Sequence, residues 1–198
     1  MIAIIDYGMG NLRNVYKALE SIGVEAVITS DPQAISACDK VILPGVGAFK
    51  EAITTLHRTG LKEVIEESVA SGKPLLGICL GMQLLFETSY ENGSYKGLGL
   101  LPGEIIKLDV PLKVPHMGWN QLEIVKEAPI FEGISNGAYA YFVHSYHMEG
   151  PEQIISAYTT YGKKIGIAVQ RGNIYGLQFH PEKSGELGLA MLKNFASL

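Results

Sequence analysis

The first half of the chain alternates short apolar runs with amphipathic helical patterns. Residues 2–5 are apolar at nearly every position, which is typical of a strand buried on both faces, and apolar residues then recur at helical spacing as far as Gly23. The same succession predicts further strands at 24–28, 40–43 and 74–78, and helices at 32–38, 50–58, 61–71 and 80–87. Strands that alternate with helices predict an α/β fold with a doubly wound, mainly parallel open sheet.

The pattern changes after about residue 89. Residues 90–103 are rich in glycine and are expected to form a loop. Expected strands follow at 104–108, 120–125, 139–143, 154–158, 165–170 and 174–179, divided by turn signals, and a last helix is expected at 186–196. Hairpin-like pieces of this kind predict antiparallel strands that extend the sheet. No repeat or linker divides residues 1–198, so we expect a single domain.

Composition narrows the class of protein. Hydrophobic residues make up 47% of the 198 residues and charged ones 18%, as in ordinary globular domains. A net charge of −4 without a lysine or arginine cluster argues against binding to nucleic acid or to an anionic membrane. No apolar stretch approaches the roughly 20 residues that span a bilayer, and the N-terminus lacks the basic region of a signal peptide. With only two cysteines, Cys38 and Cys79, we expect a cytoplasmic protein.

One of these cysteines lies in the run GICLG at residues 77–81, between an expected strand and an expected helix. This arrangement is typical of a nucleophile elbow with Cys79 at its apex. The turn strains the backbone, and glycines two positions before and after the nucleophile avoid side-chain collisions there. The helix start directs its positive dipole end at the sulfur and favours the thiolate. The alternative is a buried, inert cysteine in a strand–helix turn.

A nucleophilic cysteine requires a base, and five histidines are available. His180 and Glu182 are separated by one proline, which favours an extended chain, so both side chains point to the same side at the end of a strand. Glu182 can then orient the ring while His180 faces the sulfur. His147 and Glu149 have the same spacing and remain a rival pair, whereas His57 lies in a helical stretch and is expected at the surface. No metal-ligand spacing is present, and we expect no cofactor.

The run DYGMGNLR at residues 6–13 follows a strand and opens a helix, like a dinucleotide-binding motif. Arg13 stands where the third glycine would allow close helix–strand packing. The glycines are better interpreted as a tight turn.

Longer stretches resemble a known family. GICLGMQ at 77–83 and HPE at 180–182 resemble the triad (class I) glutamine amidotransferases, which use Cys, His and Glu. Within that class, DYGMGN at 6–11, PGVGAF at 44–49, PHMGWN at 115–120 and YFVHSY at 141–146 are similar to the glutaminase subunits of imidazole glycerol phosphate synthases. The resemblance spans essentially the whole chain. It implies a class I glutamine amidotransferase-like fold with a flavodoxin-like core.

The resemblance also implies a reaction. Cys79 would attack the carboxamide of L-glutamine, and His180 with Glu182 would release ammonia and hydrolyse the glutamyl thioester. The N–H groups of Leu80 and Val46 would form the oxyanion hole. The residues implied for the glutamine pocket are Gly47, Gln83, Ser145 and Tyr146.

The family passes its ammonia to a separate (β/α)8 cyclase, in a heterodimer that makes imidazole glycerol phosphate and AICAR during histidine biosynthesis. Met117 and Trp119 are apolar residues in a stretch that is expected to form a turn. An isolated chain gains little from apolar side chains there, which indicates that they contact a partner. Their alternative role is a local cap over the core. The full set expected at or near the interface is Met9, Asn11, Met117, Trp119, Asn120 and Lys183.

Three alternatives stay open at this point. The chain could serve as the amidotransferase for pyridoxal phosphate, guanylate or anthranilate synthesis, although those proteins lack the PHMGWN stretch. It could be a cysteine hydrolase or redox sensor on a similar sheet, which would tolerate loss of Glu182. It could also be an idle regulatory subunit, which would function fully without Cys79.

Overall fold

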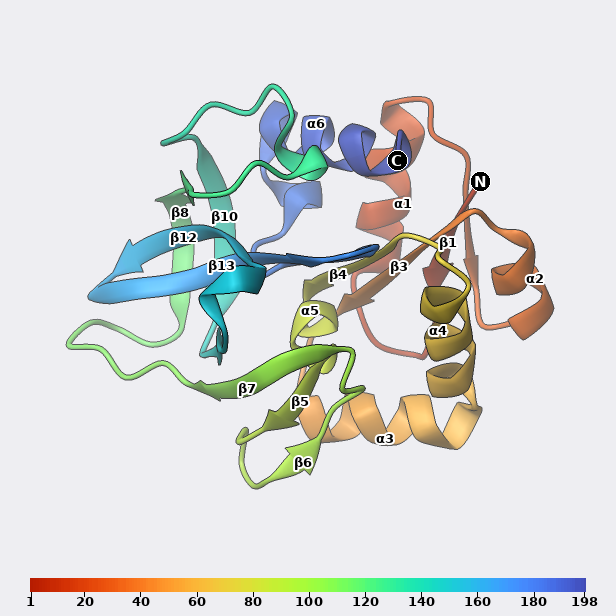
Figure 1. Ribbon diagram of the computed structural model, residues 1–198, viewed down its shortest axis with the longest axis horizontal. Helices are drawn as coiled ribbons and strands as arrows, with labels where there is room; N and C mark the ends of the chain where they lie inside the picture. The colour runs from red at the N-terminus through yellow and green to blue at the C-terminus, as the bar shows by residue number, and fades with distance from the viewer.

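The computed structural model describes residues 1–198 and is built around one eight-stranded sheet (Figure 1). Its parallel part has the order β2 (Ala26–Thr29), β1 (Ile2–Ile5), β3 (Lys40–Gly45), β4 (Leu75–Cys79) and β14 (Ile174–Leu177). The antiparallel strands β13 (Lys163–Arg171), β12 (Ile155–Tyr161) and β9 (Glu123–Ile124) extend it. The expected doubly wound, mainly parallel sheet with an antiparallel extension is confirmed.

Helices cover both faces of this sheet (Figure 1). One face carries α1 (Leu12–Ser21) and α6 (Gly185–Ala196), and the other carries α3 (Phe49–Thr59) and α4 (Leu61–Ala70), with α2 (Pro32–Ala37) near the β2 edge. Strand β1 therefore has no polar face. Its Ala3 and Ile5 join one core cluster, while Ile2 and Ile4 join the cluster on the opposite side.

Local sequence signals set several element boundaries. The Asp31 carboxylate accepts a hydrogen bond from the Gln33 amide at 3.1 Å, which caps α2 as its Asp-Pro start predicts. Gly60 has a φ of +72° and separates α3 from α4. In the loop after β1, the Asp6 carboxylate accepts from the Gly8 amide at 3.0 Å. The glycines of this stretch thus form the expected tight turn.

The helix expected at 80–87 is shorter in the structure. Helix α5 covers only Leu80–Leu84, and β5 (Phe86–Ser89) follows it directly. The carbonyl of Leu84 accepts from the Leu98 amide at 2.8 Å, so a segment distant in sequence binds a carbonyl that a longer helix would need. The helical pattern of apolar residues was misleading here because Phe86, although fully buried, begins a strand.

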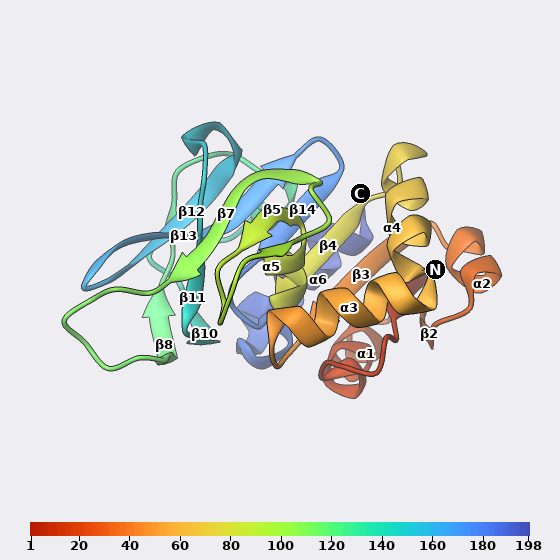
Figure 2. The same cartoon turned by 90° about the horizontal axis from the view of Figure 1, so that it is seen from below.

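Two smaller sheets were not expected. The segment 90–103 is not all loop, because it holds β6 (Tyr95–Lys96) and the start of β7 (Leu101–Lys107). With β5 and β11 (Tyr146–Glu149) these strands form a four-stranded sheet of order β11-β7-β5-β6, seen in front of the main sheet in Figure 2. Separately, β8 (His116–Gln121) pairs with β10 (Tyr139–His144) as an antiparallel ribbon. The turn expected around residues 117–119 is therefore wrong, and those residues form a strand.

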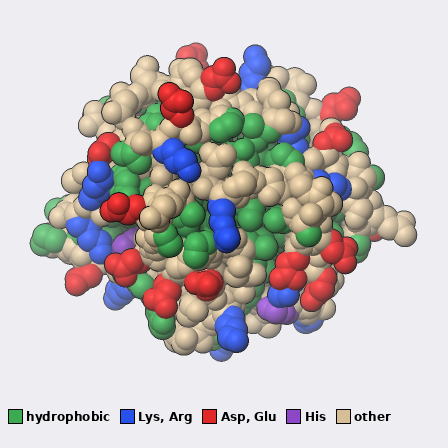
Figure 3. Space-filling model, in the orientation of Figure 1, with side chains coloured by type: hydrophobic (Ala, Val, Ile, Leu, Met, Phe, Trp, Pro, Cys, Tyr) green, Lys and Arg blue, Asp and Glu red, His purple; other side chains and the backbone are tan.

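The surface carries charges of both signs. On the face shown in Figure 3, acidic and basic side chains are interspersed. No helix combines the length and the apolar character needed to cross a membrane. Short 3-10 turns at Pro129–Phe131, Glu152–Ile154 and Pro181–Lys183 complete the chain.

Candidate active site

Three neighbouring parallel strands bring the predicted chemistry together. Cys79 ends β4, and in the sheet register it lies beside Gly45 at the end of β3. On the other side, Leu177 of β14 pairs with Ile78, which places His180 just beyond the same edge. The carboxyl ends of parallel strands are the usual location of sites in such sheets. Segments 45–47, 79–80 and 180–182 therefore converge from distant parts of the sequence.

The turn at Cys79 is a strained elbow, as predicted. Cys79 has a φ of +55°, a backbone conformation that residues with side chains rarely adopt. A Cβ on Gly81 would lie 1.8 Å from the carbonyl oxygen of Leu43, and one on Gly77 would lie 2.7 Å from Cα of Met82. Only glycine fits at either position. The elbow is thus held between strand β3 and the first turn of α5.

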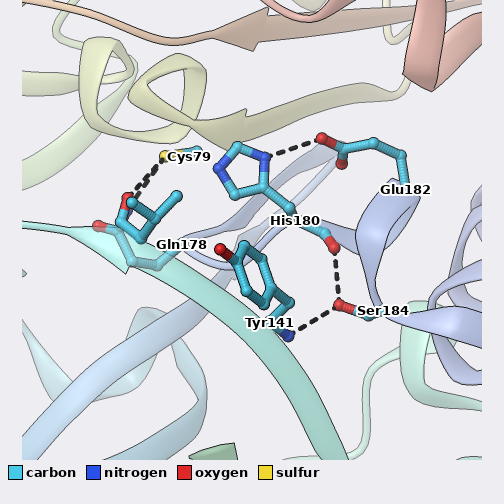
Figure 4. A network of polar contacts seen from close by, with 7 residues as sticks. Cys79, Tyr141, Gln178, His180, Glu182 and Ser184 are labelled. Atoms are coloured by element: carbon cyan, nitrogen blue, oxygen red, sulfur yellow. Dashed lines mark hydrogen bonds and ion pairs between the residues drawn. The ribbon is translucent and has the colours of Figure 1, made fainter. Parts of the chain in front are cut away.

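His180 and Glu182 form a buried pair. The Nδ1 atom of His180 lies 2.8 Å from Oε1 of Glu182, and the two side chains are 2% and 1% exposed. The other ring nitrogen, Nε2, has no hydrogen-bond partner within the protein and points toward Cys79 (Figure 4). Sulfur, imidazole and carboxylate therefore stand in the order that a catalytic triad requires.

This arrangement changes the charge of the imidazole. Burial disfavours the charged ring, but the adjacent Cys79 sulfur and Glu182 carboxylate outweigh that effect and raise the pKa of His180 to about 9. The ring is therefore protonated at neutral pH. A positive charge beside the sulfur stabilises a thiolate and also supplies the proton that a leaving group needs.

Neighbouring groups hold His180 in place (Figure 4). The Ser184 hydroxyl donates to the His180 carbonyl at 2.6 Å and accepts from the Tyr141 amide at 3.0 Å, which ties the segment to β10. Gln178 is buried and its amide donates to the Cys79 sulfur at 3.8 Å. The sequence analysis missed Gln178, although its two-residue spacing from His180 on an extended chain was a usable signal.

A pocket of about 300 Å³ opens at Cys79. Every residue predicted for the oxyanion hole or for the glutamine site borders it. Its lining consists of Val46, Gly47, Cys79, Leu80, Gln83, Glu91, Pro115, Val143, His144, Ser145, Tyr146 and His180. A larger hollow of about 730 Å³ at residues 124–134 has neither a cysteine nor a histidine in its lining.

The loop after β3 forms one wall of this pocket. Gly47 has a φ of +101°, and a Cβ there would lie 2.9 Å from Cε of Met9. The Tyr7 hydroxyl donates to the Pro44 carbonyl at 2.9 Å from beneath the loop. Burial, with a smaller contribution from Cys79, raises the pKa of Tyr7, so this hydroxyl keeps its proton. The loop is therefore anchored at Pro44.

Glu91 is a second residue that the sequence analysis missed. It borders the pocket, and its Oε2 accepts from the Phe49 amide at 2.8 Å, which caps the start of α3. Glu91 lies in a loop with no local motif, and its partner is distant in sequence. Only the tertiary structure shows its place.

Neither His147 nor His57 forms a second histidine–carboxylate pair. His147 is buried, its Nδ1 lies 2.8 Å from the Met148 carbonyl, and burial lowers its pKa. Glu149, its rival partner, is exposed, so the pair predicted as an alternative does not assemble. His57 is exposed on α3, as expected. No group of three or more His, Cys, Asp or Glu side chains is gathered to hold a metal ion.

Five of the six predicted interface residues fall into two groups. Met117 and Trp119 point outward from β8 and are 61% and 56% exposed, and the Trp119 ring meets Tyr141 edge-on at 6.1 Å. Lys183 lies over the Tyr141 ring at 6.0 Å, so these four residues form one exposed patch, called here the β8–β10 face. Half-buried Met9 lies instead against the pocket loop, and half-buried Asn11 precedes α1.

Asn120, the sixth predicted interface residue, uses its side chain for hydrogen bonds within the chain. Its side-chain amide donates to the Thr160 carbonyl at 3.0 Å and contacts His116 Nε2 at 3.2 Å, while its oxygen accepts from the Gln121 amide. The side chain is thus engaged inside the protein. A strand alternates its side chains, which is why Asn120 faces inward while Trp119 faces outward.

Comparisons with known proteins agree with this geometry. The family model described as "Glutamine amidotransferase class-I" matches residues 3–197. Imidazole glycerol phosphate synthase subunit HisH of Bacillus cereus (strain G9842) is 54% identical over 195 residues, which are 98% of this chain and 93% of that protein. HisH of Bacillus cytotoxicus is 55% identical over the same shares of the two chains.

Solved structures show the same fold at lower identity. A crystal structure of a glutamine amidotransferase superimposes with a TM-score of 0.78 at 20% identity and covers 100% of both chains. The structure of PurLQS from Thermotoga maritima superimposes with a TM-score of 0.76 at 20% identity, and the match covers 99% of this chain and 97% of that one. The chain therefore belongs to the class I glutamine amidotransferase family and, within it, to the HisH subunits of imidazole glycerol phosphate synthase.

Proposed function

We propose that this chain is a glutaminase subunit that hydrolyses L-glutamine to glutamate and ammonia for imidazole glycerol phosphate synthesis. The observation that carries the proposal is the meeting of Cys79, His180 and Glu182 in one pocket of a chain that belongs to the HisH subunits. In this proposal, residues 1–198 form a single glutamine amidotransferase domain that acts in the cytoplasm.

The first half-reaction forms a thioester. The Cys79 thiolate attacks the carboxamide carbon of glutamine, and the carbonyl oxygen becomes an oxyanion. The N–H groups of Leu80 and Val46, which both border the pocket, stabilise that charge. The C–N bond then breaks as the His180 imidazolium protonates the departing nitrogen, so ammonia leaves and a glutamyl thioester remains.

The second half-reaction returns the enzyme to its starting state. Neutral His180 takes a proton from water, the resulting hydroxide attacks the thioester, and the Cys79 thiolate leaves as glutamate forms. Glu182 keeps the proton of the ring on Nδ1 throughout, so that Nε2 faces the reacting atoms. No step requires a cofactor.

The pocket also offers groups that recognise glutamine. The Gln83 amide nitrogen donates to the Tyr146 carbonyl and to Gln178, which leaves the Gln83 oxygen as an acceptor for substrate N–H groups. The Glu91 carboxylate is an acceptor for the substrate ammonium group. Gly47, Ser145 and Tyr146 border the space that remains for the backbone of the amino acid.

The loop with Gly47 provides a means of control. Its positive φ lets the Val46–Gly47 region rotate and carry one oxyanion donor toward the pocket or away from it. Loss of one such donor costs about 2.7–4 kcal/mol, or a factor of roughly 10²–10³ in rate. Contact between Gly47 and Met9 offers a partner a route to this loop. In this proposal, a loop that turns the donor away would let the enzyme spare glutamine when no partner stimulates it.

We assign the β8–β10 face to the cyclase partner, a (β/α)8 barrel that receives the ammonia in a heterodimer. The face exposes Met117 and Trp119, large apolar side chains with little to gain in the isolated chain. Aromatic residues at the centre of an interface commonly dominate its binding energy.

Replacement of Trp119 by alanine should weaken binding to the cyclase by about 30-fold or more, as loss of about 2 kcal/mol at a hot spot implies. Isothermal titration of the purified subunits measures this. The matched control is Leu198→Ala, which removes another exposed apolar side chain, at the C-terminus. Unchanged affinity in Trp119→Ala would move the interface elsewhere and would favour a local structural role for Trp119.

The experiment that tests the function is the release of glutamate from glutamine, measured for the chain alone and with the cyclase and its nucleotide ligand. We expect slow release by the chain alone and a steep rise with the liganded cyclase. Release that ignores the cyclase would point to another amidotransferase or a free hydrolase. No release under any condition would point to an idle subunit.

A further inference from the structure

A chain of hydrogen bonds links strand β8 to the wall of the pocket. Nδ1 of His116 lies 2.9 Å from Nε2 of His144, and Nδ1 of His144 lies 2.8 Å from the Tyr146 carbonyl oxygen. At the other end, the Asn120 amide nitrogen lies 3.2 Å from Nε2 of His116. His144 borders the pocket, whereas His116 does not.

Both ends of this chain fix the positions of its protons. The Tyr146 carbonyl can only accept, so Nδ1 of His144 carries a hydrogen and its Nε2 accepts from Nδ1–H of His116. Because the Asn120 nitrogen also donates to the Thr160 carbonyl, it is the donor to Nε2 of His116. Neutral rings satisfy all these contacts in one way only, with the proton on Nδ1 in both.

Burial keeps the His116 and His144 rings neutral, and ring stacking holds the His116 ring in place. Burial lowers the pKa of His116 to about 4 and that of His144 to about 3. The His116 ring is stacked between Phe142 at 4.8 Å and Tyr161 at 4.1 Å. The direction of these hydrogen bonds is therefore preserved at neutral pH.

The Tyr146 carbonyl is also a junction of the pocket. It accepts a second hydrogen bond from the Gln83 amide at 3.1 Å, and that amide also donates to Gln178 at 3.0 Å. Gln178 in turn contacts the Cys79 sulfur. The Tyr146 carbonyl and Gln178 thus together hold the Gln83 side chain beside the nucleophile.

We propose that His116 is a positioning residue for the glutamine pocket: its Nδ1–H holds His144 in the tautomer that binds the Tyr146 carbonyl and so fixes the Gln83 side of the pocket. This inference rests on the proposed function. It assigns to β8 an inward role that is separate from the partner surface on its other side.

The first test reads the tautomers directly and needs no activity. The ¹⁵N chemical shifts of histidine in the full wild-type chain distinguish a protonated from an unprotonated ring nitrogen. We expect the Nδ1–H form for both His116 and His144, unchanged down to about pH 5.5, as burial of neutral rings requires. The Nε2–H form at His144 would overturn the proposal.

The second test uses two variants at the same position in the complex with the cyclase. In His116→Asn the amide nitrogen stands near the place of Nδ1, whereas in His116→Gln it stands near that of Nε2. We expect the glutamine variant to raise the KM for glutamine about tenfold with kcat changed less than about threefold, because it leaves Nε2 of His144 without a donor. The asparagine variant should keep a KM near that of the wild type.

The pair of variants separates positioning from general stability. Similar KM values in His116→Gln and the wild type, or equal increases in both variants, would overturn the proposal. If His116→Gln does not fold, the ¹⁵N shifts of His144 provide the test. The Nδ1–H form must then be found both in the wild type and in His116→Asn. Absence of glutamate release by the wild-type complex would instead overturn the proposed function. The wild-type assay alone therefore distinguishes the two failures.

Discussion

Replacement of Cys79 by alanine should reduce glutamine hydrolysis by at least about 10⁴-fold in kcat, because removal of a triad nucleophile leaves only the contribution of binding and the oxyanion hole. Alanine fits the elbow without a new contact, so the fold should persist. Glutamate release by the variant with the cyclase measures the loss.

Two controls make this result specific. Cys38 is the only other cysteine, and it is buried at 2% exposure with no place in the pocket, so Cys38→Ala should retain glutaminase activity. The Cys79→Ala complex, supplied with ammonium salt in place of glutamine, should still make the cyclase product. Hydrolysis by Cys79→Ala near the wild-type rate would contradict the thioester mechanism.

Replacement of Glu182 by glutamine should lower kcat by about 10³–10⁴-fold while glutamine binding changes little, as with neutralised carboxylates in other triads. The amide cannot balance the charge of the imidazolium, and it can turn its N–H toward Nδ1 of His180, which would place the ring proton on the wrong nitrogen. Steady-state kinetics of the variant with the cyclase measure the effect.

The same variant should change the pH dependence. In the folded wild type the pKa of His180 is raised from 6.5 to about 9, so the protonated ring contributes stability that is complete below pH 6.5 and is lost as the pH rises through 9. Without the Glu182 charge the pKa falls, because burial then acts with less opposition. We expect the melting temperature of the variant to decline less between pH 6.5 and 9 than that of the wild type.

Glu149→Gln is the matched control, since Glu149 follows His147 at the same spacing but is exposed and unpaired with it. Its kinetics and its melting profile should match the wild type. A loss of activity in Glu149→Gln equal to that in Glu182→Gln would show that neither change reports on the triad.

The catalytic residues were predictable because they lie in short local sequence motifs. The glycines beside Cys79 and the proline between His180 and Glu182 constrain the backbone where they stand, so local patterns were sufficient. Alternating apolar strands and helices likewise predicted the mainly parallel sheet, whereas the strand order that places β4 beside β14 comes from the structure. The rival pair at His147 had the same local pattern, and only burial and partners in the fold exclude it.

What the sequence analysis missed depends on contacts between distant segments. Glu91 reaches the start of α3 from a loop, and β5 pairs with β7, with Phe86 opposite Leu101, across an intervening segment that includes β6. The turn expected at Met117 failed for the same reason, since a glycine beside apolar residues suggests a turn until a partner strand is known. Such pairings leave no periodic signal in either segment alone.

Strand β8 carries two tasks on its two sides, with Trp119 outward and His116 inward. A strand repeats every two residues, so a one-residue shift in the pairing of the whole of β8 with β10 would exchange the sides. The Trp119 indole would then turn toward the inside of the protein, and the His116 imidazole would leave its place between Phe142 and Tyr161 for the solvent side. Single substitutions in this strand are therefore compatible with both roles, whereas insertion or deletion of one residue is not. Changes in chain length should occur in the neighbouring loops instead.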